Sequence, residues 1–193
     1  MGSRHARLRR VLGKDDVRSI SRRYFIANGF DGTLTSIGVV VGAYLSGIDN
    51  GVTAIMIGLG AAVGLGTSGV WSVWEIERAE ALAEQERLER AMLTELEDTR
   101  VQREHRAAQI VHAVASATGP ILAIVVTLSP LALEGVVFTM FQAVLASICV
   151  GIAILATFGV YLASISKQRW YVAAARMGLA GIVVAAINVI LPG

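Results

Sequence analysis

Long apolar stretches alternate with polar segments along most of this chain. Five such stretches are present, at residues 24–46, 51–74, 110–129, 136–163 and 171–191. The hydrocarbon core of a bilayer is about 30 Å thick, and roughly 20 helical residues cross it. Backbone polar groups need internal partners in lipid, and a helix provides them within one segment. The pattern therefore predicts an all-α, polytopic membrane protein with five transmembrane helices.

Basic residues are confined to one side of these predicted spans, apart from Arg176. Of the 17 lysine and arginine residues, eight lie in 1–23, six in 75–109 and two at Lys167 and Arg169. None lies in the alternate flanks, which are residues 47–50, 130–135 and 192–193. Positive charge is retained on the cytoplasmic side of a membrane. We therefore expect the N-terminus inside and the C-terminus outside.

The same pattern divides the chain into four parts. These are a basic cytoplasmic N-terminal segment at 1–23, transmembrane helices 1 and 2 within 24–74, a charged cytoplasmic helix within 75–109, and transmembrane helices 3–5 within 110–191. From Glu75 to about Arg106 there is no proline or glycine, and apolar residues recur at helical spacing. This spacing predicts one long helix that projects from the second span into the cytoplasm.

Small residues recur four positions apart in the first two spans. Two ridges run along the second span, one with Gly58, Ala62 and Gly66 and the other with Gly60, Gly64 and Ser68. Small residues let helix backbones approach closely in lipid, where packing drives association. A partner helix can belong to the same chain or to a second copy, so we expect a homodimer. In the third span, Gly119-Pro120 predicts a kink or a locally unwound stretch.

Composition and charge refine this interpretation. Hydrophobic residues make up 54% of the chain and aromatic residues 6%, which excludes an ordinary soluble domain. Residues 1–23 carry eight basic and two acidic groups, and no aromatic residues are interleaved with the first four arginines. We expect this segment to bind anionic lipid headgroups and not nucleic acid. Cys149 is the single cysteine, which excludes an intrachain disulfide, and we expect it to be a small buried apolar residue.

Charged side chains inside a bilayer are costly, so those within the spans are the main functional candidates. Asp31 lies about seven residues into the first span, or roughly 10 Å deep at 1.5 Å per residue. Similar counting brings four other polar side chains to that region, namely Asn28, Thr67, Ser68 and, at a shallower level, His112. Oxygen ligands with one imidazole suit divalent manganese or ferrous iron. We therefore predict a candidate metal site around Asp31.

Structural alternatives apply to each of these residues. Arg176 is expected near the depth of Asp31, so the two can simply pair as counter-ions. His112 is close enough to the membrane surface to be solvated. Thr67 and Ser68 can return their hydroxyls to backbone carbonyls, as such residues often do in membrane helices. Asp31 is the candidate least explained by structure alone.

The charged cytoplasmic helix offers further carboxylates. Glu80 and Glu84 share one face, and they are candidate metal ligands if two such helices lie side by side. The alternative is a solvated helix of mixed charge, because arginines are interspersed and Glu86 with Arg90 forms a good helical pair. No nucleotide-binding loop, nucleophile–base pair or paired histidine motif is evident, so neither an ATP-driven pump nor an enzyme is expected.

The segment Asn28-Gly29-Phe30-Asp31-Gly32-Thr33-Leu34-Thr35-Ser36-Ile37-Gly38 resembles the first-helix signature of the vacuolar iron transporter (VIT) family. Five spans, a cytoplasmic extension between the second and third, and a Gly-Pro followed by a second proline in the third are also similar to that family. The likeness runs from about residue 22 through most of the chain. The family's Ser-Met pair in the second helix is not matched, since glycine follows Ser68.

The resemblance implies export of ferrous or related divalent ions from the cytoplasm, coupled to inward proton movement. It also implies a homodimer whose pathway runs near the dimer axis, with Asp31 at the family's first-helix aspartate of the translocation site. Glu75 most nearly matches the glutamate at the cytoplasmic end of the second helix, and Glu84 or Glu86 matches an acid further along. The family's acidic cytoplasmic helices gather metal ions before transport.

Together these features predict a dimeric, multi-pass transporter in the cell membrane that exchanges ferrous iron or manganese for protons. Asp31 would bind the ion, and Glu75 and Glu84 would attract it. Protonation of a carboxylate in a medium of low dielectric removes its charge, so proton entry would release the metal. We expect no permanently bound cofactor. The alternative is a membrane scaffold or assembly protein on the same fold, which Arg176 and the missing methionine favour.

Overall fold

The computed structural model describes residues 15–93 and 100–190, which fold into helices. In chain order these are α2 (Asp15–Leu45), α3 (Gly51–Met92), α4 (Arg100–Leu128), the short 3₁₀ helix η1 (Ser129–Leu133), α5 (Met140–Ser166) and α6 (Trp170–Ile190). Five helices in this part of the chain are long and apolar enough to cross a membrane. The prediction of an all-α, five-span membrane protein is confirmed.

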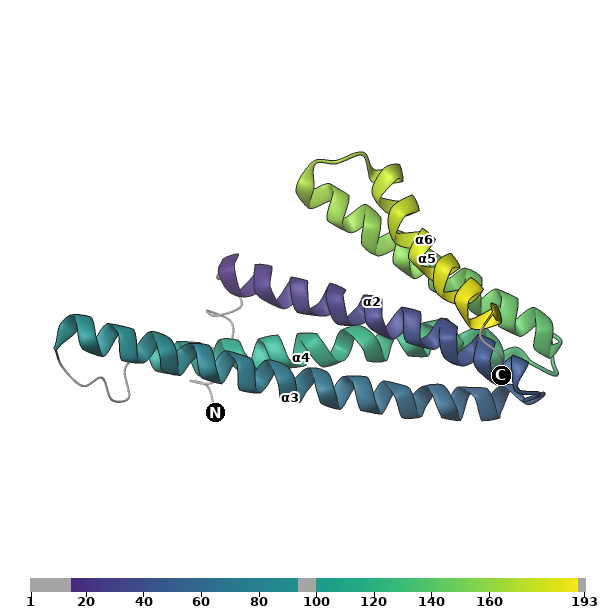
Figure 1. Ribbon diagram of the computed structural model, residues 1–193, viewed down its shortest axis with the longest axis horizontal. Coiled ribbons are helices and arrows are strands. Elements are labelled where there is room, and N and C mark those ends of the chain that lie inside the picture. The colour runs from purple at the N-terminus through teal and green to yellow at the C-terminus, as the bar shows by residue number, and fades with distance from the viewer. Residues whose placement is uncertain (1–14, 94–99, 191–193) are drawn as a thin grey trace.

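The helices form two groups that meet along α2. Figure 1 shows α3 and α4 side by side, with α2 along α4 and with α5 and α6 as an antiparallel pair on the other side of α2. The α5–α6 pair lies near the end of α2 and diverges from its beginning (Figure 1). The start of α2, the end of α3 and the α5–α6 turn all lie toward one end of the bundle. We call this the basic end, after Arg22, Arg23, Lys167 and Arg169.

Glycines allow α2 and α4 to pack in close contact. A Cβ added at Gly32 would lie 2.6 Å from the Pro120 Cα, and one added at Gly119 would overlap the carbonyl oxygen of Phe25. Both spacings are closer than ordinary van der Waals contact, so only glycine fits at these positions. Helix α4 continues through Pro120, and the locally unwound stretch considered from the sequence is absent.

The two ridges of small residues on α3 have different surroundings. Gly58 and Gly66 are buried against Leu128 and Ile121 of α4. Gly60 and Gly64 are exposed, and a Cβ added to either would have no neighbour within 4 Å. One ridge therefore packs within the chain, and the other is open.

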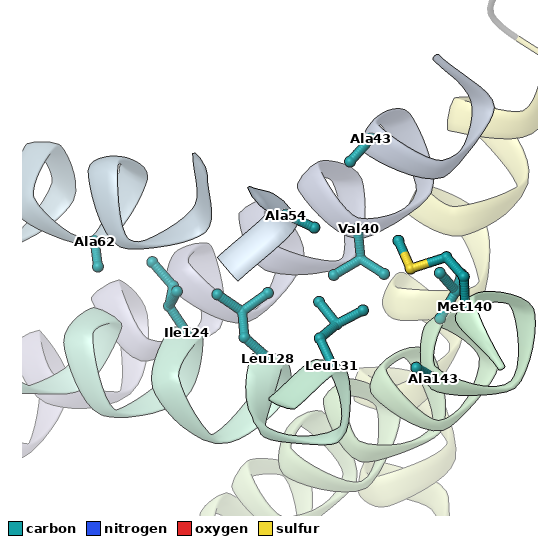
Figure 2. Close-up of a cluster of buried hydrophobic side chains, with 10 residues drawn as sticks. Val40, Ala43, Ala54, Ala62, Ile124, Leu128, Leu131, Met140 and Ala143 are labelled. Atoms are coloured by element: carbon teal, nitrogen blue, oxygen red, sulfur yellow. The ribbon is translucent and has the colours of Figure 1, made fainter. Parts of the chain in front are cut away.

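The main apolar core lies at the end of the bundle opposite the basic end, where α2, α3, α4, η1 and α5 meet. Figure 2 shows nine labelled members of this cluster, which are Val40, Ala43, Ala54, Ala62, Ile124, Leu128, Leu131, Met140 and Ala143. The core holds the five elements together beside the α2–α3 turn. Cys149 is exposed on α5, so the expectation that it is buried is wrong for the single chain.

The charged segment differs from the single helix expected between Glu75 and Arg106. Its first part continues α3 to Met92, and Leu93 then takes the left-handed conformation that ends the helix. Its last part, from Arg100, already belongs to α4. The prediction of one separate helix is therefore wrong, because the segment contains the ends of two helices. The first of these, α3, is 42 residues long. Most of the predicted lipid-binding segment 1–23 lies outside the described residues, as do 94–99.

Candidate functional site

Asp31 lies on the face of α2 that turns away from the close contact with α4. Its carboxylate is exposed and lines a cavity of about 660 Å³ between α2, α5 and α6. Gly32, the next residue, is buried against Pro120. Because successive helical residues point about 100° apart, the glycine contact directs Asp31 toward the cavity.

Three arginines share the cavity with Asp31. Arg22 and Arg23 come from α2, and Arg176 comes from α6. Asp31 and Arg176 form no ion pair in the part of the chain that the structure describes. The counter-ion pairing considered from the sequence is therefore not present, although both charges face the same space. The carboxylate remains available to a ligand that enters the cavity.

Asn28, which we expected near Asp31, instead joins three helices. Its Nδ2 donates to the Ser116 Oγ at 2.6 Å, and the Ser116 hydroxyl donates to the Gly69 carbonyl at 3.0 Å. The two bonds link α2 through α4 to α3, and Ser116 is fully buried. Asn28 thus holds the bundle together on the side of α2 away from the cavity.

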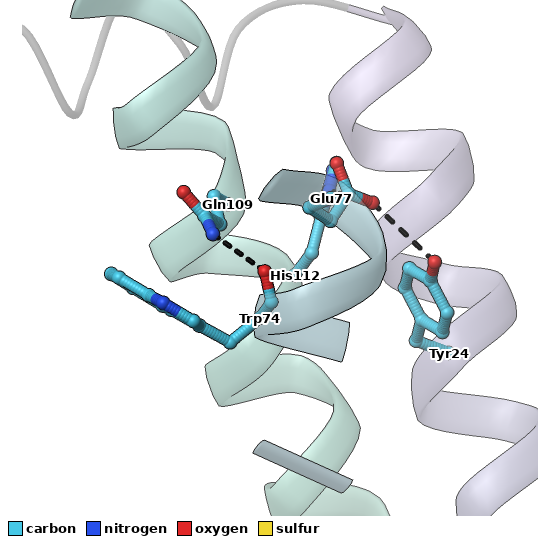
Figure 3. Close-up of polar contacts among 5 residues, drawn as sticks. All are labelled: Tyr24, Trp74, Glu77, Gln109 and His112. Atoms are coloured by element: carbon cyan, nitrogen blue, oxygen red, sulfur yellow. Dashed lines mark hydrogen bonds and ion pairs between the residues drawn. The ribbon is translucent and has the colours of Figure 1, made fainter. Parts of the chain in front are cut away.

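His112 belongs to a separate polar cluster at the basic end. Its side chain is 3% exposed, and its Nδ1 lies 2.9 Å from the Glu77 Oε1, whose side chain is 16% exposed. The two atoms lack hydrogen-bond geometry, so the contact is electrostatic and becomes an ion pair when the imidazole is protonated. The Tyr24 hydroxyl donates to the same Glu77 oxygen at 3.4 Å. Figure 3 shows these residues projecting from three helices.

Burial excludes the simple solvation of His112 that the sequence allowed. Its Nε2 is also buried and has no hydrogen-bond partner among the described residues. Nearby, the Gln109 Nε2 donates to the Trp74 carbonyl at 2.7 Å (Figure 3). The cluster therefore connects α2, α3 and α4 where the span of α3 gives way to its charged part.

Sequence reasoning did not single out Glu77. The signal was present, because Glu77 extends the buried stripe of α3 by one turn beyond Val73, at the spacing of three or four residues that runs along that stripe. A carboxylate that continues a stripe of small and apolar residues is expected to face the neighbouring helices.

Thr67 and Ser68 are exposed on α3 and are not directed into the helix contacts. Asn28, Thr67, Ser68 and His112 therefore do not converge on Asp31 within one chain, contrary to the prediction from the sequence. Asp31 faces the cavity beside α5 and α6, whereas Asn28 and His112 contact α3 and α4. Any role of these residues in transport stays a prediction.

Four acidic residues of α3 beyond the span are exposed, namely Glu75, Glu80, Glu84 and Glu86, whereas Glu77 and Glu89 are partly buried. Glu75 lies 4.0 Å from Arg78 and Glu84 lies 3.9 Å from Arg87, each within one helical turn. Glu80 is exposed one turn before Glu84. No group of three or more histidine, cysteine or acidic side chains in residues 15–93 and 100–190 is arranged to hold a metal ion. A single copy therefore presents isolated carboxylates, several beside arginines.

Comparison with protein-family models adds evidence that is independent of this geometry. The model of the VIT family matches residues 72–191, which is more than half of the chain. The chain belongs to the VIT family. No match was found with curated proteins or with solved structures.

Membership of the VIT family indicates a membrane transporter of metal ions and fits a role other than an enzyme. With five helices able to span a bilayer, it indicates an integral, multi-pass membrane protein. The match includes Glu75, Glu77, His112 and Arg176, and it begins after Asp31. The assignment of Asp31 thus depends on its resemblance to the first-helix signature and on its position in the cavity.

Proposed function

We propose that this VIT family protein exports ferrous iron or manganese from the cytoplasm in exchange for protons, across the cell membrane. The observation that carries the proposal is the position of Asp31. Its carboxylate lies in the apolar part of α2, is held in place by the Gly32–Pro120 contact and lines a cavity at the basic end. A charge at that depth is costly, so its presence points to a function.

One carboxylate suffices to couple metal and proton movement. A proton and a divalent cation compete for the same oxygens, so protonation of Asp31 releases the metal and metal binding displaces the proton. Entry of protons down their gradient then drives metal outward without ATP. The exposed Glu75, Glu80 and Glu84 on α3 would raise the local concentration of cations at the cytoplasmic side.

A homodimer is part of the proposal, because Asp31 alone provides too few ligands. Manganese and ferrous ions favour sites with several oxygen or nitrogen ligands, and the described part of one chain has no such group. A second copy placed with its Asp31 facing the first would supply a second carboxylate. The family resemblance, with a pathway near the dimer axis, supports this arrangement.

A second candidate function is a membrane scaffold or assembly factor that keeps the fold without transport. The specific observation in its favour is the charge of the cavity, where Arg22, Arg23 and Arg176 accompany the single carboxylate of Asp31. Three guanidinium groups repel a divalent cation. The missing methionine after Ser68 agrees with this candidate.

Flux measurements separate the two functions. Purified protein in liposomes with a pH gradient should move Fe²⁺ or Mn²⁺, and Asp31→Asn should abolish the movement. Asp49→Asn is the matched control, because Asp49 lies in the exposed α2–α3 turn outside the cavity. Unchanged flux in Asp31→Asn would refute the role of this carboxylate. Absence of flux and of calorimetric metal binding in the folded wild type would favour the scaffold.

A further inference from the structure

The cavity that contains Asp31 has an excess of positive charge. Three arginines, Arg22, Arg23 and Arg176, line it together with one acidic residue, Asp31. None of these arginines forms an ion pair with a carboxylate in the described ranges. Unpaired guanidinium groups that line one space favour an anionic ligand, and phosphate oxygens match their planar donors.

The mouth of the cavity lies where lipid headgroups are expected. Ser166 at the end of α5 and Gln168 in the α5–α6 turn line it, and Lys167 and Arg169 lie in the same turn. Trp170 and Tyr171 follow at the start of α6, and both are exposed. Tryptophan and tyrosine concentrate at membrane–water interfaces, so this end of the cavity faces the headgroup layer.

The walls beyond the arginines are apolar. On α2, Ile26 and Phe30 follow Arg22 and Arg23 by one and two turns toward the membrane interior, and Leu162 and Met177 line the cavity from α5 and α6. Arg176 is set deeper than the other arginines, but its long side chain can extend toward the headgroups. Positive charge near the mouth and an apolar wall behind it match an amphipathic molecule.

We propose that this cavity binds an anionic glycerophospholipid from the leaflet at the basic end. The phosphate would lie among the three arginines, and an acyl chain would follow the apolar wall toward Phe30. A free inorganic anion would use the arginines and leave the wall unfilled, so the lipid matches more of the cavity. The inference does not depend on transport, although a bound phosphate would also offset the arginine charges that repel a cation approaching Asp31.

Native mass spectrometry of the purified full chain in neutral detergent tests this site. Titration with dioleoyl phosphatidylglycerol should show a retained lipid, and dioleoyl phosphatidylcholine at the same concentration should bind at least tenfold more weakly. Arg22→Gln/Arg176→Gln should weaken phosphatidylglycerol binding about 25-fold, since each basic group near an anionic surface contributes roughly a factor of five. The matched control is Arg78→Gln/Arg87→Gln, which removes the same charge from the exposed part of α3.

Competition measurements distinguish a lipid phosphate from a free phosphate, and a conservative variant covers the case in which the glutamine variant does not fold. Inorganic phosphate and glycerol 3-phosphate at millimolar concentration should not displace the lipid, and the dihexanoyl lipid should bind more weakly than the dioleoyl form. Arg22→Lys/Arg176→Lys keeps the charge but not the planar donors, so its affinity should fall between those of the wild type and the glutamine variant, and unchanged affinity in a folded lysine variant would argue against recognition by guanidinium groups.

Three results would overturn the proposal. These are equal binding of the two lipids, equal loss in the cavity and control variants, or displacement by free phosphate. A change of oligomeric state in Arg22→Gln/Arg176→Gln with lipid binding unchanged would instead assign the cavity to a second copy. Because binding is read without flux, failure of the transport proposal leaves this test valid.

Discussion

Gly32 of α2 and Pro120 of α4 lie so close that a Cβ on the glycine would stand 2.6 Å from the proline Cα. This contact fixes the rotation of α2 about its own axis. Because Asp31 precedes Gly32, the same contact decides which space the carboxylate faces. Helix packing on one side of α2 thereby positions the candidate site on the other.

The contact predicts a position-dependent effect of the smallest side chain. Gly32→Ala should lower the stability of the protein by about 1–3 kcal/mol, because the methyl group meets backbone that cannot move aside. Gly42→Ala on the same helix should cause no loss, since nothing lies within 4 Å of its added Cβ and alanine favours helix by up to about 1 kcal/mol. Thermal unfolding in detergent measures both. Equal melting temperatures would contradict the close packing.

The bonds through Ser116 make a second prediction. Ser116→Ala removes the acceptor of the Asn28 amide and the hydroxyl that joins α4 to the Gly69 carbonyl, so we expect a loss of about 1 kcal/mol. Thr118→Ala is the control, because that hydroxyl bonds only to the carbonyl of Val114 in its own helix. If both variants melted at the same temperature, the bond between helices would contribute nothing measurable.

Glu77 and Glu80 give a third matched pair. Glu77 contacts His112 and Tyr24 and is largely buried, whereas Glu80 is exposed. Glu77→Ala should destabilise the contacts among α2, α3 and α4 by about 1–3 kcal/mol, because it removes the acceptor of the Tyr24 hydroxyl and the carboxylate beside the buried His112. Glu80→Ala should stay within about 0.5 kcal/mol of the wild type. Hydrogen exchange should then rise around Gln109 and His112 only in the first variant, and no rise there would count against the cluster.

Arg176 allows a test that depends on the transport proposal. In liposomes of phosphatidylcholine alone, Arg176→Gln should lower the KM for Mn²⁺ several-fold, because it removes a positive charge from the cavity of Asp31. Arg169→Gln removes the same charge from the α5–α6 turn, outside the cavity lining, and should change the KM less. A KM that is unchanged or higher in Arg176→Gln would show that the ion does not pass this arginine.

The architecture was predictable because it depends on features that are local in sequence. Apolar length gave the five spans, and the family resemblance carried by Asn28 to Gly38 agrees with the later family match. The end of α3 was not predicted because it falls at Leu93, which takes a left-handed conformation. The glycine or proline that usually marks the end of a helix is absent there.

The candidate site was harder to predict because depth and direction are separate quantities. Counting residues places Asp31, Asn28 and His112 along the membrane normal, but it does not give the rotation of each helix. Rotation is set by long-range contacts such as Asn28 with Ser116, which join residues far apart in sequence. The contact between His112 and Glu77 could not be predicted for the same reason.

Helix α3 runs without interruption from its first span residue, Gly51, to Met92, and beyond Gly69 it contains neither glycine nor proline. At 1.5 Å per residue it is a rod about 60 Å long. Such a rod behaves as a lever, since its charged outer portion cannot swing without tilting the portion inside the bilayer. A ligand or partner that pulls on the carboxylates near Glu84 would therefore strain the packing of Gly58 and Gly66 against α4.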